Sequence, residues 1–439
     1  MAPRTSAHVR KPLTPLPRHP DLASWLRWQE TLNPSTIDLG LDRVREVWGR
    51  IHPGAGRLPF PVITVGGTNG KGSCVAMLEA IYRAGGYRTG CYSSPHLLRY
   101  TERIRLDGTE VWEGDLCVAF QRVDQARGDT RLTFFEFGTL AALDLFLRAA
   151  PDLAILEVGL GGRLDAVNLI DPDLALVTTI ARDHMAWLGD TLDAIALEKA
   201  GIFRQGRPAL IGSRNPPPAL RRRAEEIGAQ TFQLGQEFDA QPSLEGWRWQ
   251  GPGAAPMAMP LPALRGGFQR DNAATVLMAA ALLQPRLPLP ANALRQGLQR
   301  VRLAGRFQVF PGEPTLILDV AHNGQAAESL AANLGAYPCR GRRHAVLGVL
   351  RDKAVQEILK PLLHLMDTWD LGQADDPRAL PVVELRAAFG PDTAATVAAH
   401  PDLAGALAAA LARCQAGDCV VVFGSFTTVE AALRLRGLA

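Results

Sequence analysis

The segment Phe60-Pro-Val-Ile-Thr-Val-Gly-Gly-Thr-Asn-Gly-Lys-Gly-Ser73 decides how this chain is expected to fold. Pro61–Val65 is a short apolar, β-branched run that is typical of a buried strand, and two glycines end it. The residues after Ser73 are apolar at helical spacing, so the glycines lie between a strand and a helix N-terminus. Free backbone N–H groups and the helix dipole make such a turn a phosphate site. Lys71 would add a charge at the outer phosphates, and the Ser73 hydroxyl could ligate magnesium.

This segment departs from the strict phosphate-loop pattern in two places. Val65 stands where the pattern has its first glycine, and Gly72 separates Lys71 from the following serine. The competing interpretation is an ordinary glycine turn, and only the structural context separates the two.

The composition excludes several classes of protein. A length of 439 residues predicts two or three domains, and 47% hydrophobic with 21% charged residues is typical of a globular protein. A net charge of +3, from 47 basic and 44 acidic residues, argues against a nucleic-acid partner. Six cysteines without a C-x-x-C pair predict free thiols in a reducing cytoplasm.

We expect neither a secretory signal at the start of the chain nor a membrane span in its apolar segments. Residues 1–20 are basic and rich in proline, with no apolar core, so we expect a flexible tail and not a secretory signal. Glu136, Asp144 and Arg148 interrupt the most apolar region, Phe134–Gly162, so no membrane span is expected.

Strands and helices are predicted to alternate in two units. Polar residues follow several buried runs in the first unit, and Asp239–Met259 is irregular and hairpin-like. The strands expected after the glycine-rich loop are Thr89–Ser94, Asp152–Gly159, Leu174–Ile180, Pro208–Gly212, Thr315–Val320, His344–Val349, Thr368–Leu371 and Cys419–Gly424. Helices are expected between them, including Val355–Met366 and Pro401–Cys414, and Leu22–Arg50 also looks helical.

This alternation predicts an α/β protein with parallel sheets and crossover helices. We expect an N-terminal P-loop ATPase-like domain with a parallel central sheet over residues 21–303. A smaller C-terminal Rossmann-like α/β domain would cover residues 304–439, with the boundary near Arg300–Phe307.

Three polar clusters stand at the carboxyl ends of strands in the first unit. They are Ser93/Ser94, Glu157 and Asp183/His184, and open α/β sheets bind ligands at that edge. Magnesium prefers oxygen ligands, which suits Glu157, Ser94 and Ser73. His184 is an unusual magnesium ligand, so a helix cap or a partner of Asp183 is the alternative. For Ser94 the alternative is a Ser-Pro turn.

Three further ionisable residues need an explanation. Lys199 could pair with Glu198 or Glu157, but an amine near metal ions would be repelled, unless it lies apart from them or is carboxylated. Glu136 lies in an apolar helix, Leu132–Arg148, where a buried carboxylate needs a partner. Asp38 is either a helix N-cap or a solvated acid.

An ordered set of motifs, found over nearly the whole chain, resembles the folylpolyglutamate synthases, which belong with the Mur-type peptide ligases. Lys-Gly-Ser/Thr after the loop glycine is also that family's form, which accounts for Gly72. The motifs are Gly67-Thr-Asn-Gly-Lys-Gly-Ser73, Ser93-Ser-Pro-His96, Leu156-Glu-Val-Gly-Leu-Gly-Gly-Arg-Leu-Asp165, Asp183-His184, Glu198-Lys-Ala-Gly-Ile-Phe203, Gly305-Arg-Phe307 and Asp319-Val-Ala-His-Asn323.

The resemblance implies a role for individual residues. Lys71, Lys199 and His184 would be catalytic, with Lys199 carbamylated, and His322 would help place the active face of the second, glutamate-ligase domain. Ser94, Glu157 and His184 would hold magnesium, with two ions implied and a monovalent cation left open. The ATP contacts would be Thr68, Asn69, Gly70, Lys71, Gly72, Ser73, Asn272, Arg306 and Asp319.

Two segments, Thr36–Leu41 and Leu132–Gly138, resemble the bifunctional dihydrofolate synthase/folylpolyglutamate synthases. In that form they line the dihydropteroate pocket. The residues implied are Asp38, Leu39, Gly40, Thr133, Phe134, Phe135, Glu136, Leu164, Asp165 and Ala166. The chain departs from the family at Gly324, where proline is common, and glycine also suits such a turn.

The implied activity is ATP-dependent ligation of L-glutamate to dihydropteroate and to reduced folates through an acyl phosphate. A cytoplasmic monomer would fit, with no nucleic-acid or membrane partner. One alternative is a monofunctional folylpolyglutamate synthase. A second is a Mur-type ligase for a peptidoglycan precursor, but such ligases lack the inserted Gly72 and carry a domain before the loop, where this chain has only residues 1–59. A third is a non-catalytic nucleotide-binding module, which would not need Glu157, His184 and a second α/β domain.

Overall fold

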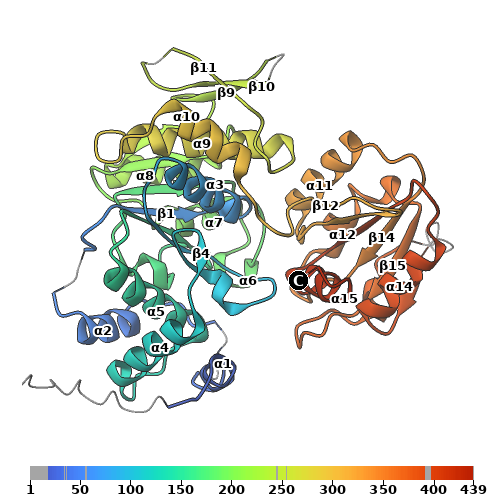
Figure 1. The fold of residues 1–439 in the computed structure, drawn as a ribbon, viewed down its shortest axis with the longest axis horizontal. Helices are drawn as coiled ribbons and strands as arrows, with labels where there is room; N and C mark the ends of the chain where they lie inside the picture. Colours follow the sequence, from blue (N-terminus) through green and yellow to red (C-terminus); the bar gives the residue numbers. More distant parts are fainter. Residues whose placement is uncertain are drawn as a thin grey trace, which may run out of the picture.

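The computed structural model describes residues 18–33, 35, 37–54, 57–243, 246–253, 255–390 and 397–438. Two α/β units lie side by side, a larger one and a smaller one (Figure 1). The tail expected over residues 1–20 falls, up to residue 17, outside the described residues. None of the described helices is long and apolar enough to cross a membrane. All six cysteines are free, as expected.

The larger unit is built on an eight-stranded sheet with the order β4-β3-β2-β5-β1-β6-β7-β8. The pairs from β2 to β8 are parallel, and the β2–β3 and β3–β4 pairs at one edge are antiparallel. The strands are β1 (Val62–Gly66), β2 (Thr89–Tyr92), β3 (Ile104–Leu106), β4 (Thr109–Glu110), β5 (Leu153–Glu157), β6 (Leu174–Val177), β7 (Pro208–Ile211) and β8 (Gln230–Gln233).

Helices cover both faces of this sheet because its central strands are apolar on both sides. Ile63 and Val65 of β1 pack on one face with α3 (Lys71–Ala84), α9 (Gly267–Leu283) and α10 (Ala291–Arg300). Two further groups of helices cover the other face (Figure 1). They are α1 (Leu22–Gln29), α2 (Asp42–Ile51), α4 (Glu113–Arg127) and α5 (Phe134–Ala149), and α6 (Met185–Leu188), α7 (Leu192–Ala200) and α8 (Pro218–Ile227).

A three-stranded antiparallel sheet packs outside α9, and the hairpin-like prediction for Asp239–Met259 is thereby confirmed. Its strands are β9 (Asp239–Ser243), β10 (Gly246–Gln250) and β11 (Met257–Met259), at the top of Figure 1. The Trp249 indole donates a hydrogen bond to the Ala274 carbonyl of α9, at 3.1 Å.

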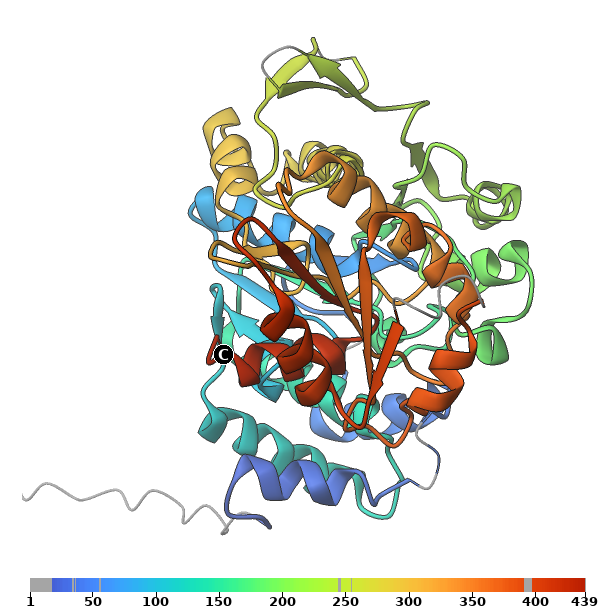
Figure 2. The same ribbon diagram turned by 90° about the vertical axis from the view of Figure 1, so that its right-hand side faces the viewer.

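The smaller unit has a six-stranded sheet with the order β12-β13-β17-β14-β15-β16. It is parallel except for the antiparallel β12–β13 pair, and helices cover both faces. Figure 2 shows this unit, orange to red, in front of the larger one. Its elements are β12 (Gln308–Phe310), β13 (Thr315–Leu318), α11 (Gly324–Ala336), β14 (Arg343–Leu347), α12 (Val355–Leu359), β15 (Thr368–Gly372), α13 (Val382–Ala387), β16 (Val397–His400), α14 (Leu403–Arg413), β17 (Cys419–Phe423) and α15 (Phe426–Leu435). The predicted fold class, two α/β units with parallel sheets, is confirmed.

Several predicted elements differ from those observed. The helix expected over Val355–Met366 is wrong: α12 ends at Leu359, and a short 3-10 turn covers Leu363–Leu365. Pro361 explains this break, since proline has no backbone N–H with which to continue the helical hydrogen bonds. The segment Leu22–Arg50, expected to be helical, contains the two helices α1 and α2, and residues 37–40 between them are not helical. Strand β16 was not predicted.

Candidate active site

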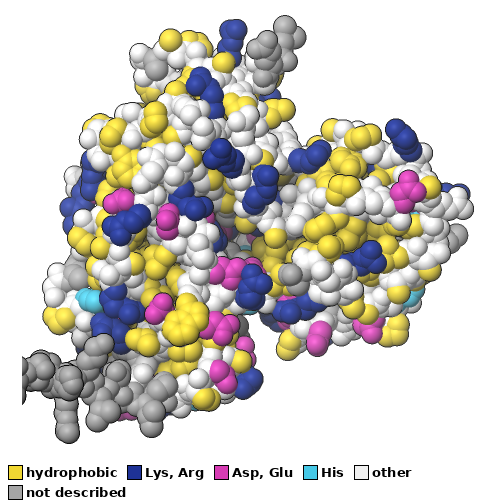
Figure 3. All heavy atoms as spheres, in the orientation of Figure 1, with side chains coloured by type: hydrophobic (Ala, Val, Ile, Leu, Met, Phe, Trp, Pro, Cys, Tyr) yellow, Lys and Arg dark blue, Asp and Glu magenta, His cyan; other side chains and the backbone are white. Residues whose placement is uncertain are grey.

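A cavity of about 1330 Å³ lies between the two units, and the residues assigned a role from the sequence line it, whereas Ser93 of the polar clusters does not. The space-filling view shows the hollow between the units (Figure 3). Its walls are loops that follow β1, β2, β5 and β6 of the larger sheet and β13, β14 and β17 of the smaller one. Each of these strands ends toward the cavity, so parallel pairing brings polar residues from distant parts of the chain together.

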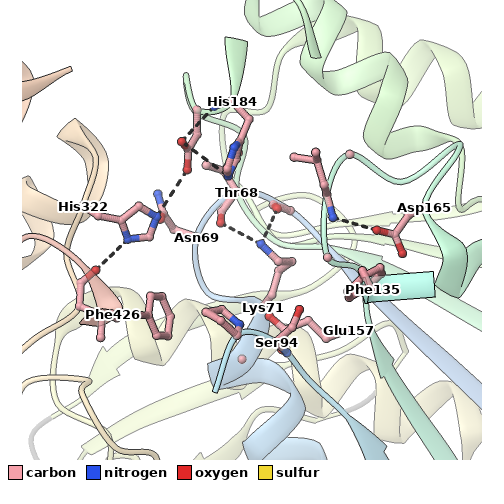
Figure 4. A pocket seen from close by; sticks show the side chains of 18 of the residues that line it. Thr68, Asn69, Lys71, Ser94, Phe135, Glu157, Asp165, His184, His322 and Phe426 are labelled. Atoms are coloured by element: carbon pink, nitrogen blue, oxygen red, sulfur yellow. Dashed lines mark hydrogen bonds and ion pairs between the residues drawn. The ribbon is translucent and has the colours of Figure 1, made fainter. Parts of the chain in front are cut away.

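The glycine-rich turn after β1 has a backbone that only glycine adopts without strain. Gly67 has φ +133°, and a Cβ there would lie 1.8 Å from the Thr178 hydroxyl oxygen. Gly70, the N-cap of α3, has φ +91°. The Lys71 amine folds back and donates to the carbonyls of Gly67 and Thr68, at 3.1 and 3.2 Å (Figure 4). Burial lowers the pKa of Lys71, and Glu157 opposes that shift.

Glu157, at the end of β5, is buried at the floor of the cavity. Within the described part of the chain its carboxylate accepts one hydrogen bond, from the Ser94 backbone N–H at 3.3 Å, and forms no salt bridge. Burial raises the pKa of Glu157, while Lys71 lowers it. Nearby, the Ser73 hydroxyl accepts a hydrogen bond from the Gln269 amide at 3.1 Å. A buried carboxylate with so few partners, beside two serine hydroxyls, fits a hard divalent cation.

Asp183 and His184 follow β6 and face the smaller unit. His184 is the N-cap of α6 with φ +51°, but its side chain makes no capping hydrogen bond, and its 3.9 Å contact with Asp183 is long. Burial lowers the pKa of His184 to about 4. Asp183 instead pairs with Lys353, at 2.7 Å. Burial opposes ionisation of Asp183, yet the hydrogen bond from His322 and the neighbouring cations hold its pKa well below its usual range.

Lys199 is buried at the end of α7, where its amine donates to the Gly67 carbonyl at 2.9 Å. Burial, helped by the charge of Lys71, lowers the pKa of Lys199 to about 7. Neither of the ion pairs considered for Lys199, with Glu198 or with Glu157, is found among the described residues. Glu198 instead accepts from Arg163, at 2.8 Å, because its side chain points away from the glycine-rich turn toward the loop that carries Arg163.

Hydrogen bonds join the glycine-rich turn to the smaller unit. The Asn69 amide donates to Asn323 at 3.1 Å and to Gln325 at 2.7 Å. Thr179 donates to the same Gln325 oxygen at 2.9 Å. Asp183 adds a 3.5 Å contact to His322 (Figure 4). The turn is therefore in direct contact with the second unit.

The other residues expected at the nucleotide, outside the glycine-rich turn, are Asn272, Arg306 and Asp319. Asn272 of α9 lies under Gly70, where an added Cβ would be 2.8 Å from its amide oxygen. Arg306 stacks over the Phe426 ring at 5.2 Å. The Asp319 carboxylate accepts the backbone N–H groups of Phe307 and Ala321, both at 2.8 Å. Asp319 thereby fixes the backbone beside Arg306.

A second group of expected residues forms the far wall of the cavity. Arg43 of α2 bridges Asp38, at 2.8 Å, and Glu136, at 3.0 Å. Glu136 and Thr133 also form a capping box at the start of α5. Asp38 is therefore an ion-pair partner, since Leu41 is the N-cap of α2, and Glu136 has the partner that its burial requires.

Asp165 lies beside this wall and is 2% exposed. It accepts backbone N–H groups of Leu160 and Val167, at 2.8 and 2.9 Å (Figure 4). Burial raises the pKa of Asp165 to about 6.

The sequence did not single out Arg43, Gln325 or Lys353, and Arg43 itself lies outside the cavity lining. A buried Glu136 signalled that some cation must face it, but nothing in the sequence identifies which of many arginines does so. Gln325 and Lys353 act across the two units, so their roles depend on how the units meet.

The comparisons with known proteins agree with this geometry. The Mur ligase middle domain family matches residues 65–248, and the Mur ligase glutamate ligase domain family matches residues 305–426. The dihydrofolate synthase/folylpolyglutamate synthase of Escherichia coli K12 is 43% identical over 408 residues, 93% of this chain and 94% of that protein. The structure of E. coli FolC with DHPP and ADP superimposes with a TM-score of 0.89 at 42% identity, covering 95% of this chain and 98% of the other. A bifunctional folylpolyglutamate synthase/dihydrofolate synthase with Mn, AMPPNP and L-glutamate bound gives a TM-score of 0.86 at 41% identity, with the same coverage.

Proposed function

The chain belongs to the Mur ligase family, among the dihydrofolate synthase/folylpolyglutamate synthases, and from that premise we propose what each part of its cavity does. It is an ATP-dependent ligase that joins L-glutamate to dihydropteroate and to reduced folates. One observation supports the assignment of roles: the glycine-rich turn, the buried Glu157 and the far wall all border one cavity, which the second unit closes. The far wall is the one where Arg43 pairs with Asp38 and Glu136.

The ATP phosphates are proposed to lie on the turn Thr68–Ser73. Its backbone N–H groups at the N-terminus of α3 and the Lys71 amine would receive them. Binding would take Lys71 from the two carbonyls that it now contacts. Asn272 would contact the nucleotide from the larger unit, and Arg306 and Asp319 from the smaller one.

Ser94, Glu157 and His184 are proposed to hold divalent cations, and two ions would be bound. Its under-partnered carboxylate and the neighbouring hydroxyls suit Mg²⁺, while the neutral state favoured by the low pKa of His184 leaves a ring nitrogen free to ligate. When bound, these cations would neutralise the phosphate charge.

Lys199 is proposed to carry a carbamate. Carbamate formation needs an uncharged amine, and a pKa near 7 leaves about half of the amine uncharged at neutral pH. Lys199 is buried beside the glycine-rich turn. In its ammonium form it would repel a bound metal ion, whereas the carbamate is an anion and would attract one.

The acceptor substrate is proposed to lie along the far wall, against Asp38–Gly40, Thr133–Glu136 and Leu164–Ala166. The ring of Phe135 and the fixed carboxylates of that wall would face its ring system. The glutamyl or benzoyl carboxylate would then point toward the phosphates.

Catalysis by these residues consists of positioning and charge neutralisation. The acceptor carboxylate attacks the terminal phosphorus of ATP, so an acyl phosphate forms and ADP leaves. The amine of L-glutamate attacks the acyl carbon, phosphate leaves, and a proton from the amine passes to solvent. Acyl phosphates hydrolyse readily, so the contacts of Asn69 and Asp183 with the second unit would keep water out.

We place the domain boundary between residues 303 and 304, in the segment that joins α10 to β12. We also propose that the protein is a cytoplasmic monomer. The free cysteines are compatible with a reducing compartment.

The test measures ADP release with dihydropteroate and with tetrahydrofolate, each with and without L-glutamate, and the mass of every product. We expect products one glutamate heavier from both acceptors, loss of activity with a chelator, and its return with Mg²⁺. Glu157→Gln should lower kcat by about a hundredfold or more, whereas Glu225→Gln, a control on the exposed side of α8 and outside the cavity lining, should not.

Each other outcome has a defined meaning. Product from tetrahydrofolate but not from dihydropteroate would indicate a monofunctional folylpolyglutamate synthase. ADP release that does not depend on L-glutamate would contradict the proposed function.

A further inference from the structure

A buried carboxamide on the cavity wall has no partner in the described part of the protein. Gln29 is the last residue of α1, is 1% exposed, and lines the cavity. Neither its side-chain nitrogen nor its side-chain oxygen has a hydrogen-bond partner among the described residues. Its backbone carbonyl is engaged, since it accepts from Leu32 at 3.2 Å. Leaving both ends of a buried amide unpaired opposes folding.

The neighbouring polar side chains of the same wall do have partners. Asn33 donates to Asp38 at 3.4 Å, Asp38 pairs with Arg43, and Glu136 with Thr133 and Arg43. Several other buried polar atoms of the described residues also lack partners, but those of Gln29 alone belong to a residue that lines the cavity. The unpaired amide therefore belongs to a residue of the cavity wall, and since its two polar atoms are themselves buried, pairing with a ligand requires the Gln29 side chain to turn toward the cavity.

Gln29 lies at the acceptor end of the cavity. Helix α1 packs against α5, where the rings of Trp28 and Phe137 meet at 6.0 Å. The first turn of α5 carries Phe134–Glu136, which belong to the proposed acceptor wall. A ligand that pairs with Gln29 therefore occupies the acceptor site.

We infer that the Gln29 carboxamide recognises the pterin ring of the acceptor, an inference that rests on the proposed function. A primary amide presents an N–H donor and a C=O acceptor side by side. The 2-amino-4-oxo edge of a pterin presents the complementary pair, a ring N–H beside a C=O. Two parallel hydrogen bonds then satisfy both ends of Gln29 and fix the ring in one orientation. Gln29 is thus a specificity-determining residue that touches the substrate far from the reacting atoms.

The test compares Gln29→Leu, which keeps a similar volume, and Gln29→Glu, which keeps only acceptors, with the control Arg27→Leu on the exposed face of α1. The KM and Kd for dihydropteroate should rise about tenfold in Gln29→Leu, the usual effect of losing such hydrogen bonds. Gln29→Glu should also weaken binding. The kcat and the KM values for ATP and L-glutamate should change less than twofold, and Arg27→Leu should behave as the wild type.

A second measurement separates recognition from a structural role. Without acceptor, Gln29→Leu should melt at or above the wild-type temperature, since it removes an unpaired buried amide. Dihydropteroate should then raise the melting temperature of the wild type more than that of the variant.

Two results would overturn the inference. One is unchanged dihydropteroate affinity in Gln29→Leu. The other is a clear fall in its ligand-free melting temperature, because the amide would then have a partner inside the protein, such as a bound water. If the wild type itself makes no glutamylated product from dihydropteroate, the proposed function fails first, so the two failures are distinguishable.

Discussion

The bridge made by Arg43 gives the sharpest prediction. Arg43→Met leaves Glu136, whose side chain is 4% exposed, without its cation. Breaking a buried ion pair in this way costs about 3–5 kcal/mol. Arg43 is 27% exposed and Glu136 keeps the Thr133 N–H at 2.7 Å, so we expect a lower cost of about 2–3 kcal/mol. Asp38, at 40% exposed, adds little.

A double-mutant cycle isolates the pair. Glu136→Gln removes the buried charge, so Arg43→Met should cost about 1–2 kcal/mol less in that background than in the wild type. The lost contact with Asp38 is common to both sides of the cycle and cancels. Urea unfolding followed by tryptophan fluorescence gives the four free energies, since Trp25, Trp28 and Trp48 lie in α1 and α2.

The matched control is Arg45→Met, on the exposed side of the same helix, which should be nearly neutral. In Arg43→Met the KM for dihydropteroate should rise and that for ATP should not. The reasoning is refuted if Arg43→Met costs the same, within about 0.5 kcal/mol, with Glu136 or with Gln at that position.

Three other predictions concern the turn, Asp165 and the contact between the units. Gly67→Ala should lower the ligand-free melting temperature by several degrees or prevent folding, since the added Cβ would lie 1.8 Å from the Thr178 hydroxyl oxygen. The control Gly72→Ala should not, since the nearest neighbours of its Cβ would be 3.8 Å away. Equal melting temperatures of the two variants would contradict this prediction. Burial raises the pKa of Asp165 from its ordinary value of 3.8 to about 6 in the folded state, so this carboxyl contributes stability that is lost as pH rises toward 6. Asp165→Asn should accordingly be more destabilising at pH 5 than at pH 8, by about 1 kcal/mol in thermal or urea unfolding, and the opposite order would show that the carboxylate is favoured in the folded state. Gln325→Ala removes the bonds to Asn69 and Thr179, so the Kd for ATP should rise about tenfold with little change in folding, while Gln356→Ala on the outside of the second unit should have no effect.

Much of the fold could be predicted because local signals agree with the tertiary structure. The apolar run before Gly66 forms a strand that is buried along its whole length, and the residues after Ser73 form the predicted helix. Parallel topology then brings Ser94, Glu157 and Asp183 to one edge, because β2, β5, β1 and β6 are neighbours in the sheet. The end of α12 near Pro361 could have been predicted from the proline alone, since proline cannot donate the next helical hydrogen bond.

The remaining features depend on contacts that no local pattern encodes. Arg43 meets Glu136 across 93 positions of sequence, and Asn69 meets Gln325 across 256. Strand β16 is short and alanine-rich, with a weak strand propensity of its own, and pairing with β15 forms it. The sequence gives no signal for Gln29, because a glutamine on an amphipathic helix is usually exposed, and only its burial in the structure shows otherwise.

The state of Lys71 links the turn to the rest of the site. Without phosphate, the Lys71 amine donates hydrogen bonds to the Gly67 and Thr68 carbonyls of the same turn. The Lys199 amine donates to the same Gly67 carbonyl. Burial is the main reason that the pKa of each lysine is lowered, and the charge of Lys71 lowers the pKa of Lys199 further. When phosphate draws Lys71 away, Lys199 keeps the Gly67 carbonyl to itself, so nucleotide binding should raise the pKa of an unmodified Lys199. Carbon dioxide that adds to Lys199 before the nucleotide arrives would remove that competition, and the protein with a carbamylated Lys199 would then be the form prepared for ATP.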